Sequence, residues 1–327
     1  MLRVFAPHSG RPVVLDANAA TASLPPDAVW IDLDHPTEAE EALVESALGI
    51  DIPTREEMQE IEDTSRLYHE GEALFMTISL IVRFDSDKPE ISPVTFILAG
   101  NRLVTLRYVE PRSFITFLAH AERHPSVCDT GAAALVGLLE AIVDRIADVL
   151  EHVGRDIDNV STAIFDRDPR SGGRLSGIDF RELLRLVGQN QGRTAKLRDS
   201  LVSLSRLLSF LALPREEQHH KLLHGHVESL TRDVSSLTQH GASVASIINF
   251  QLDALLGMIN VEQNGIIKIF SVASVALMPP TLIASIYGMN FKSMPELDWS
   301  FGYPIALTLM IVSAILPYLY FKRRGWL

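Results

Sequence analysis

The sequence contains only one cysteine, Cys128, among its 327 residues. A single thiol cannot form an intrachain disulfide, which excludes a disulfide-stabilised secreted domain and suits a reducing cytosol. The first residues, MLRVFAPHSGRPVV, also lack the apolar core of a secretory signal peptide. We therefore expect the N-terminal part of the protein to be cytoplasmic.

Basic residues are scarce outside the C-terminal end. The chain has 29 Lys and Arg against 41 Asp and Glu, and five of the basic but only two of the acidic residues lie beyond residue 265. The preceding part therefore holds 24 basic and 39 acidic residues, a net charge of −15. This charge argues against nucleic acid as a partner, because phosphate binding needs a basic face. It suits a protein that handles cations, with an ordinary acidic surface as the alternative.

Motifs of the common enzyme classes are also missing. The sequence has no Gly-x-x-x-x-Gly-Lys-Ser/Thr phosphate loop and no Ser/His/Asp or Cys/His arrangement with a suitable spacing. It also lacks the interrupted inverted repeats of secondary transporters. We expect a protein that is not an enzyme and that uses no organic cofactor.

Two long apolar segments occupy the last sixty residues. They cover 269–287 and 301–321, and each has the length of about 20 residues that a membrane-spanning helix needs. The chain closes with Lys322, Arg323 and Arg324, whereas the loop between the segments has one lysine and two carboxylates. Because basic residues stay cytoplasmic, we expect a membrane hairpin with both termini inside.

The chain before the hairpin changes its pattern near residue 125. Short β-rich runs with a hairpin turn at Gly100 and Asn101 predict a mixed sheet with a few helices. The runs are 13–15, 29–31, 73–82, 94–98 and 103–108, with a helical stretch at 37–48. Farther on, apolar residues at spacings of three and four predict helices over 131–165 and 176–213, with a turn around 168–173.

A stretch of 64 residues between Pro214 and Pro279 contains no proline. It is much longer than an ordinary globular helix, and it continues into the first apolar segment. The sequence therefore predicts one long helix that is part soluble stalk and part membrane span. The resulting domains are a cytoplasmic α/β domain at 1–125, a helical and stalk region at 126–265, and a transmembrane hairpin at 266–327.

Polar and pliable residues recur on one face of this long helix. The first and last of these residues lie 36 positions apart, which is about ten helical turns or about 54 Å. Because this is a whole number of turns, the residues stay on the same side of the helix along its length. The residues are Asn249, Asp253, Asn260, Asn264, Ser271, Ser274, Met278, Thr281 and Ser285. Several copies around an axis would turn this face toward a water-filled pore, with the second span facing lipid. The alternatives are hydroxyls that bond back to their own helix and small residues that serve helix packing.

The sequence Tyr287-Gly288-Met289-Asn290-Phe291, followed by Met294-Pro295-Glu296-Leu297, ends the first span. In this position it resembles the CorA family of magnesium channels, and the likeness covers the whole plan of the chain. The resemblance implies an α+β cytoplasmic domain, a long stalk helix and two C-terminal transmembrane helices, assembled as a homopentameric funnel in the bacterial inner membrane. It also implies influx of Mg²⁺, and of Co²⁺ and Ni²⁺, with closure by cytoplasmic Mg²⁺.

The resemblance also implies roles for single residues. Gly288, Met289 and Asn290 would form the outer mouth, where Asn290 contacts the hydrated ion. Asn264, Met278 and Thr281 match pore positions, and Asp253 matches an acidic ring. Phe270 stands where relatives have an aliphatic constriction, and Ser285 where they have glycine. One position of the family's inter-subunit Mg²⁺ sensor falls on Ser229, so that site does not transfer.

These residue types suit a hydrated cation. Mg²⁺ loses its water reluctantly, and amide and carbonyl oxygens bind its water shell without the deep trap that a carboxylate ring would make. Phe270 and Met278 suit a gate that closes by dewetting, or else pack between subunits. Glu296 and Asp298 in the outer loop would raise the local cation concentration, or are simply solvated loop charges. The membrane potential suffices to drive entry.

A histidine cluster is the other candidate metal site. His220 and His224 have the i, i+4 spacing that binds Zn²⁺ or Ni²⁺ on a helix, but no nearby cysteine completes the site. A solvated helix start is the alternative.

Two other functions stay open. A ZntB-like zinc transporter would share the architecture and the Gly-Met-Asn signature, although the residues 294–297 favour the magnesium branch. A membrane-tethered coiled-coil scaffold would explain the long helix and the hairpin, but it gives no reason for the phased polar face.

Overall fold

The computed structural model describes residues 1–7, 12–17, 23–60, 62–84, 86, 88–165, 180–213, 220–290, 294–295 and 299–326. The strands in this part of the chain are β1 (Leu2–Phe5), β2 (Val13–Leu15), β3 (Trp30–Asp34), β4 (Leu67–Glu70), β5 (Ala73–Val82), β6 (Glu90–Ala99) and β7 (Arg102–Arg107). The helices are α1 (Glu38–Leu48), α2 (Asp63–Arg66), α3 (Arg112–Arg123), α4 (Gly131–Phe165), α5 (Phe180–Leu211), α6 (His220–Tyr287) and α7 (Gly302–Arg323), with short 3-10 turns at Glu57–Gln59 and Pro125–Cys128. Contacts divide the chain into two units, one of residues 1–167 and 181–251 and one whose described part is mainly 252–326. The helix α6 belongs to both.

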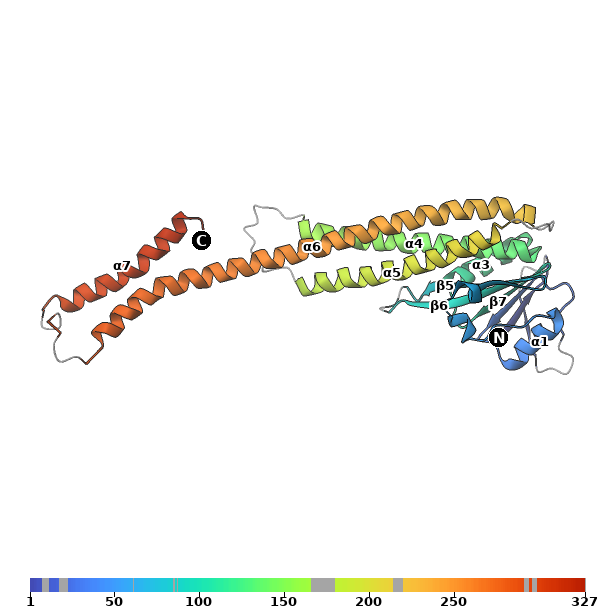
Figure 1. The fold of residues 1–327 in the computed structure, drawn as a ribbon, viewed down its shortest axis with the longest axis horizontal. Helices are drawn as coiled ribbons and strands as arrows, with labels where there is room; N and C mark the ends of the chain where they lie inside the picture. Colours follow the sequence, from blue (N-terminus) through green and yellow to red (C-terminus); the bar gives the residue numbers. More distant parts are fainter. Residues whose placement is uncertain are drawn as a thin grey trace. The chain divides into compact units, whose positions relative to one another are not determined.

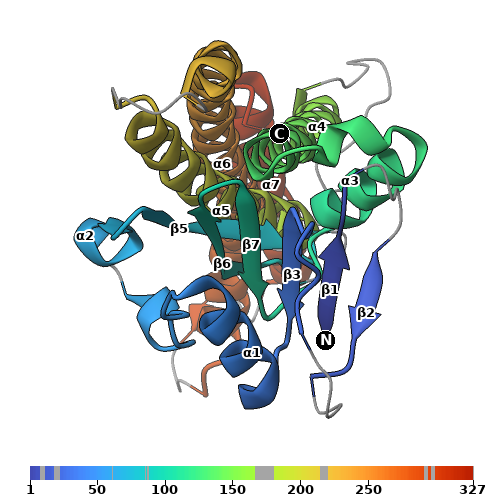
Figure 2. The same ribbon diagram turned by 90° about the vertical axis from the view of Figure 1, so that its right-hand side faces the viewer.

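The first unit contains a mixed sheet with the strand order β2-β1-β3-β7-β6-β5-β4. Only β3 and β7 pair in parallel, and the other pairs are antiparallel. One face of the sheet is covered by α1, with Val44 in an apolar core that includes Ile31 and Val104. Figure 2 shows α1 on this side, and α3 and α4 on the opposite side. There Phe114 and Phe117 of α3 contact the rings of Phe96 and Trp30, at centroid distances of 6.3 and 5.4 Å.

A buried polar network joins the parallel pair on the α3 side of the sheet. The side chains of Asp32 and Arg107 are fully buried, and Arg107 donates from Nε and Nη2 to both carboxylate oxygens of Asp32 at 3.0 and 2.9 Å. Thr105 donates to the same carboxylate at 2.8 Å and accepts from the Trp30 indole at 3.0 Å. Arg107 also donates to the Val109 carbonyl at 2.6 Å. The network therefore fixes the start of the segment that leads into α3.

The long helices of the first unit lie side by side (Figure 1). Their buried residues recur at spacings of three and four, as expected for helices that pack along one face. The helix α5 also covers the part of β5 that β4 does not reach. There the hydroxyls of Ser203 and Ser200 accept from the backbone N–H groups of Ser79 and Ile81 at 3.0 and 2.9 Å. These bonds satisfy a strand edge that would otherwise be unpaired.

The predicted fold class is confirmed in its main elements. The mixed sheet, the hairpin turn at Gly100 (φ +56°) and the helices at 38–48 and 131–165 are all present. The predicted single long helix is α6, and the second apolar segment is α7. The sequence analysis missed β1, β4, α2 and α3, and the turn expected around 168–173 lies outside the described residues. The domain boundaries at 125 and 265 stay a prediction.

Candidate functional site: the polar face of α6

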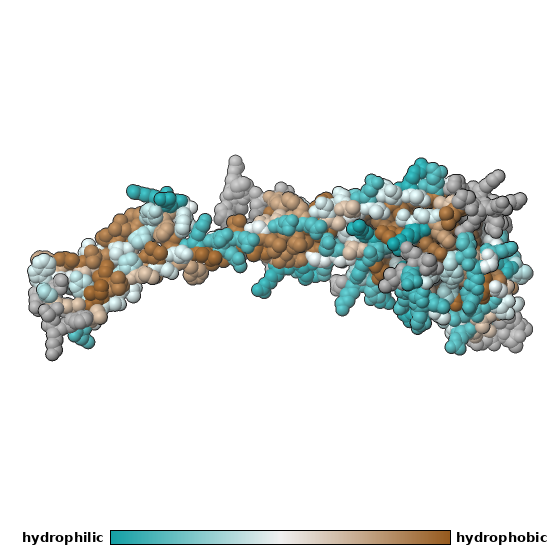
Figure 3. Space-filling model, viewed as in Figure 1, coloured by the Kyte–Doolittle hydropathy of each residue, from teal (hydrophilic) through white to brown (hydrophobic). Residues whose placement is uncertain are grey.

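The helices α6 and α7 are both long and apolar enough to cross a membrane. Most of their described large apolar side chains are exposed, among them Leu277, Leu282 and Leu316. The core helix of a soluble protein would be mostly buried, so this exposure favours a lipid or protein environment around both helices. Figure 3 shows hydrophobic residues gathered over α7 and over the end of α6.

Each helix of the hairpin nevertheless has one protected face. On α6 the buried or half-buried positions recur in steps of four, three, four and four, and the same steps recur on α7. They are Val272, Ala276, Pro279, Ile283 and Tyr287 on α6, and Ala306, Met310, Ser313, Pro317 and Phe321 on α7, and Pro280, Gly302 and Ala314 are half-buried as well. Figure 1 shows α7 turning back toward α6 after the loop. Matching spacings of this kind indicate a packed helix pair, so we assign these faces to the contact between the two helices.

The polar face of α6 points away from this contact. At about 100° per residue, the positions 271, 274, 278, 281 and 285 centre about 160° from the face that packs on α7. All five side chains are exposed in the single chain. Nearer the N-terminal end of the second unit, the side chains of Asp253, Asn260 and Asn264 are exposed as well. The arrangement leaves a polar surface that α7 does not cover.

The hydroxyls of this face bond back to their own helix. Ser274 donates to the carbonyl of Phe270 at 2.9 Å, Thr281 to that of Leu277 at 2.8 Å, and Ser285 to that of Thr281 at 2.8 Å. These are the bonds that the alternative interpretation requires. They use only the hydroxyl proton, so the oxygen lone pairs remain as acceptors. Acceptors are what the water shell of a cation requires.

Two prolines interrupt the hydrogen bonds of α6 beside Met278. Pro279 and Pro280 lie inside the helix, and neither has an N–H group to offer the carbonyls of Val275 and Ala276. Met278 and Phe270 are each 69% exposed. The middle of the span is therefore the point where the helix is easiest to bend, and it carries a large apolar side chain on the polar face.

The outer end of α6 presents Asn290 to its surroundings. The helix ends at Tyr287, and Gly288 donates from its N–H to the Ala284 carbonyl at 2.9 Å. A Cβ at Gly288 would lie 3.1 Å from that carbonyl oxygen, so glycine fits the close turn. Asn290 is exposed, and its side chain has no hydrogen-bond partner among the described residues. The predicted loop residues Glu296 and Asp298 lie outside the described part of the chain.

Gln251 anchors α6 just before the second unit begins, and the sequence analysis missed it. Its side chain is buried and donates to the Ile157 carbonyl and the Ser161 hydroxyl of α4, both at 2.7 Å. The adjacent Phe250 stacks on Phe165 with centroids 5.8 Å apart. The available signal was a polar residue at a buried heptad position, in step with Ile248 and Leu255.

The histidine site stays a prediction. The side chains of His220 and His224 are outside the described part, and the structure elsewhere places His226 Nδ1 3.1 Å from Glu140 Oε1. Among the side chains that are described, no group of three or more His, Cys, Asp or Glu gathers to hold a metal.

Comparisons with known proteins match most or all of the chain. The model of the CorA-like Mg²⁺ transporter protein family matches residues 26–323. The magnesium transport protein CorA of Haemophilus ducreyi is 36% identical over 327 residues, with 100% of both chains covered. The proteins of the same name from Salmonella typhimurium and Escherichia coli K12 are 35% and 36% identical, over 100% and 92% of both chains.

Solved structures share the fold. The CorA magnesium transporter from Methanocaldococcus jannaschii aligns with a TM-score of 0.79 at 19% identity, over 100% of this chain and 99% of that one. The full-length CmaX protein aligns with a TM-score of 0.69 at 17% identity, over 99% and 97%.

Proposed function

The chain belongs to the CorA-like Mg²⁺ transporter family, and from that premise we propose that it is a gated channel through which Mg²⁺ enters a bacterial cell. The observation that carries the proposal is the polar face of α6, which lies about 160° from the face that packs on α7. One hairpin cannot enclose a pore. We propose that five copies form a ring in the inner membrane, with α6 inside, α7 toward lipid and both termini in the cytoplasm.

The outer mouth selects the ion in this proposal. Gly288 and Asn290 supply carbonyl and amide oxygens to the water shell of Mg²⁺, which keeps its octahedral waters. The hydroxyl oxygens of Ser274, Thr281 and Ser285 continue the row of acceptors below. Each contact is neutral, so no site holds the ion too tightly for conduction. Co²⁺ and Ni²⁺ are admitted by the same hydrated geometry.

The gate lies at Met278, with Phe270 as a second constriction two turns below. Apolar side chains that narrow a polar pore close it by excluding water. The two prolines next to Met278 give the helix a place to bend when the gate opens. Entry is driven by the membrane potential, since a divalent ion gains about 4.6 kcal/mol per 100 mV, and no enzymatic reaction is required.

Ion uptake by the purified protein in vesicles tests this function. Vesicles with a negative interior potential and an internal indicator would be exposed in turn to Mg²⁺, Co²⁺, Ni²⁺ and Zn²⁺. We expect Mg²⁺ influx that grows with the potential, and none in protein-free vesicles. Influx of Zn²⁺ without Mg²⁺ would instead identify a zinc-conducting relative, and the absence of any flux would leave the scaffold function.

Cysteine labelling tests which face of α6 lines water. Cys128 is buried, and burial together with the charge of Asp129 raises the pKa of its thiol to about 11. The substitution Cys128→Ser removes this native thiol, so that labelling reports the introduced cysteines. Single cysteines at Ser274, Thr281 and Ser285 should react rapidly with small hydrophilic thiol reagents. Cysteines at Val275, Leu282 and Ile283 should react at least about tenfold more slowly, because a thiol in an apolar site stays protonated. Equal labelling on all faces would contradict a pore formed by this helix.

Cytoplasmic Mg²⁺ closes the channel in this proposal. The net charge of −15 before residue 265 makes neighbouring subunits repel, and we propose that Mg²⁺ bridges carboxylates of adjacent subunits. A shift of the closed state from 1% to 99% requires about 5.5 kcal/mol, which several inter-subunit sites supply jointly. Limited proteolysis of the soluble region should therefore slow cooperatively as Mg²⁺ rises to the millimolar range. If neither the cleavage pattern nor the flux depends on internal Mg²⁺, the proposed sensor is ruled out.

A further inference from the structure

Basic and aromatic residues gather at the C-terminal end of α7. We name this group the basic cap, and it consists of Tyr320, Lys322, Arg323, Arg324 and Trp326. All five side chains are exposed, and α7 has the length and composition of a membrane-spanning helix. The basic cap therefore lies where such a helix leaves the apolar layer of the membrane.

Aromatic residues mark both ends of α7. Its first end has the exposed side chains of Trp299, Phe301 and Tyr303, and its last turns have that of Tyr320. Tyr303 and Tyr320 are 17 positions apart in the sequence, which is about 26 Å along a helix. The hydrocarbon layer of a membrane is about 30 Å thick, and aromatic side chains gather at its two surfaces. Tyr320 thus fits one membrane surface, and the three basic residues after it fit the adjacent headgroup layer.

The basic cap has a defined backbone geometry. Gly325 adopts a φ of +71°, a left-handed conformation that favours glycine. The N–H groups of Gly325 and Trp326 donate to the carbonyls of Lys322 and Phe321, at 3.2 and 3.1 Å. The Trp326 ring lies against that of Phe321, with centroids 5.2 Å apart. This Schellman arrangement uses carbonyls that basic side chains could otherwise cap, and it holds Trp326 beside the helix.

The basic side chains of the cap have no acidic partner among the described residues. Residues 299–327 contain no Asp or Glu, and none of Lys322, Arg323 and Arg324 forms an ion pair in the described part of the chain. Arg324 lies over the ring of Tyr320, 5.5 Å from its centroid. Three adjacent cations thus lie at the level of the headgroups without a carboxylate to neutralise them.

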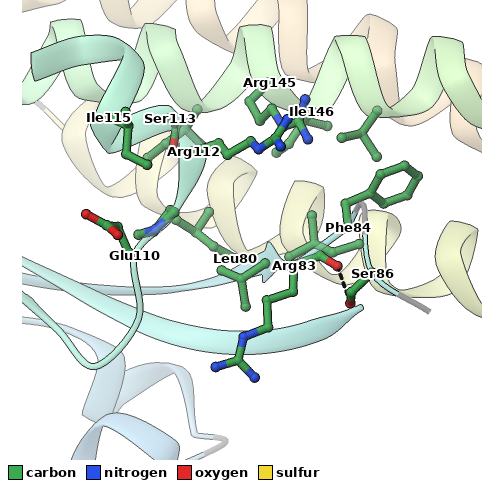
Figure 4. Close-up of a pocket in the computed structure, with 15 residues that line it drawn as sticks. Leu80, Arg83, Phe84, Ser86, Glu110, Arg112, Ser113, Ile115, Arg145 and Ile146 are labelled. Carbon is green, nitrogen blue, oxygen red and sulfur yellow. Dashed lines mark hydrogen bonds between the residues drawn. The ribbon is translucent and has the colours of Figure 1, made fainter. Parts of the chain in front are cut away.

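The arginines around the cavity of the first unit differ from those of the basic cap. This cavity lies between β5, α3 and α4, and Arg83, Arg112 and Arg145 line it (Figure 4). Arg83 pairs with Glu90 at 3.4 Å, and Arg112 and Arg145 have interaction partners as well. Their charges are engaged within the protein, whereas those of the basic cap are available to a partner outside it.

We propose that the basic cap binds the headgroups of anionic phospholipids. Phosphate oxygens accept from the guanidinium groups of Arg323 and Arg324 and from the ammonium group of Lys322. The rings of Tyr320 and Trp326 lie at the boundary of the apolar layer. A headgroup with a net negative charge is preferred to a zwitterionic one, because it adds no cation of its own beside the three basic residues. The inference requires that α7 faces lipid, as in the proposed function, but it does not require that α6 lines a pore.

Quenching of Trp326 fluorescence by brominated lipids tests the basic cap. The full chain with Trp299→Phe is reconstituted in vesicles that contain phosphatidylcholine and phosphatidylglycerol in equal amounts, with bromine on the acyl chains of only one of the two lipids. The remaining tryptophan, Trp30, is fully buried in the first unit and gives a constant background. We expect brominated phosphatidylglycerol to quench Trp326 more strongly, with a local preference of about fivefold, the effect of one basic residue at an anionic surface.

Variants test whether the basic residues cause this preference. The triple variant Lys322→Gln, Arg323→Gln and Arg324→Gln should reduce the preference to about one, because no positive charge of the cap remains. The double variant Arg323→Lys and Arg324→Lys preserves the charge and should retain most of the preference. In Trp326→Phe the reporter is Trp299, at the end of α7 that has no basic cap, and no preference is expected there. Size-exclusion chromatography shows whether each variant remains assembled.

Three outcomes would overturn the proposal. Equal quenching of Trp326 by the two lipids would mean that the cations have another partner, such as carboxylates of a neighbouring copy. A preference that persists in the triple glutamine variant, or that Trp299 shows equally, would place the anionic lipid elsewhere. The absence of quenching by either lipid would mean that α7 does not face lipid. Mg²⁺ uptake by the same vesicles tests the pore separately, so the two proposals can fail independently.

Discussion

Replacement of Asn290 by alanine is expected to abolish Mg²⁺ uptake and to leave the oligomer assembled. The side chain is exposed at the end of α6 and is not used by the fold among the described residues. In the proposed pentamer the variant loses five amides at once. If each contributes about 1 kcal/mol to holding the hydrated ion, the ring loses about 5 kcal/mol, a more than 1,000-fold change in ion occupancy. Uptake in vesicles and size-exclusion chromatography measure the two outcomes separately.

Two further variants sharpen the Asn290 experiment. Asn159→Ala makes the same substitution at an exposed position of α4, and uptake there should be unchanged. Asn290→Asp places carboxylates at the mouth, which should bind Mg²⁺ more tightly and conduct it more slowly, because conduction needs weak sites. Wild-type uptake in Asn290→Ala would remove this residue from the selectivity site.

Much of the hairpin could be predicted from the sequence. The patterns that mark its helices extend over many residues and depend only on residues that are close in the sequence. The absence of proline between 214 and 279 and the two apolar runs define α6 and α7 without tertiary information. The phase of the polar face follows from the helix period alone. The face that packs on α7 was not predictable, because Val272, Ala276 and Ile283 belong to the same residue classes as the exposed apolar residues beside them.

The missed elements of the first unit are short or ambiguous. The strands β1 and β4 have four residues each, too few for a clear alternation of period two. The helix α3 begins with Ser, Phe, Ile and Thr after Arg112, which are poor or neutral helix formers. Only residues 108–111 separate it from β7. Its buried residues Phe114, Phe117 and Ala121 have the spacings of three and four that are typical of a helix. A segment of twelve residues, however, contains too few such spacings for a clear prediction.

The buried pair of charged residues in the centre of the sheet could not be predicted from the sequence either. Asp32 and Arg107 are 75 positions apart, and they meet only because β3 and β7 pair in parallel with Asp32 opposite Thr105. Nothing in either strand specifies that partner. Gln251 is similar, since its function as an anchor depends on a carbonyl of α4 that is 94 positions away.

The buried network leads to the second large effect, which is on stability. Arg107→Met should lower the free energy of unfolding of the first unit by about 3–5 kcal/mol, because it leaves the fully buried carboxylate of Asp32 without its main partner. Arg3, whose Nη1 lies 3.7 Å from Asp32, offsets part of the loss, so we expect the lower end of this range. Pulse proteolysis of the full chain in a urea series measures the change. Arg83→Met, which breaks the exposed pair with Glu90, is the control and should cost at most about 1 kcal/mol.

A double variant separates charge from packing in this network. In Asp32→Leu with Arg107→Met, no unpaired charge of this pair remains, and buried ion pairs replaced by apolar residues of similar volume are often neutral or stabilising. We therefore expect the double variant to recover most of the stability that Arg107→Met loses. If instead the double variant is as unstable as Arg107→Met, the contribution of Arg107 lies elsewhere. The remaining candidates are its ion pair with Asp34 at 3.1 Å, its hydrogen bond to the Val109 carbonyl and its contact with the Phe114 ring, 5.2 Å from the ring centroid. The last two hold the start of α3.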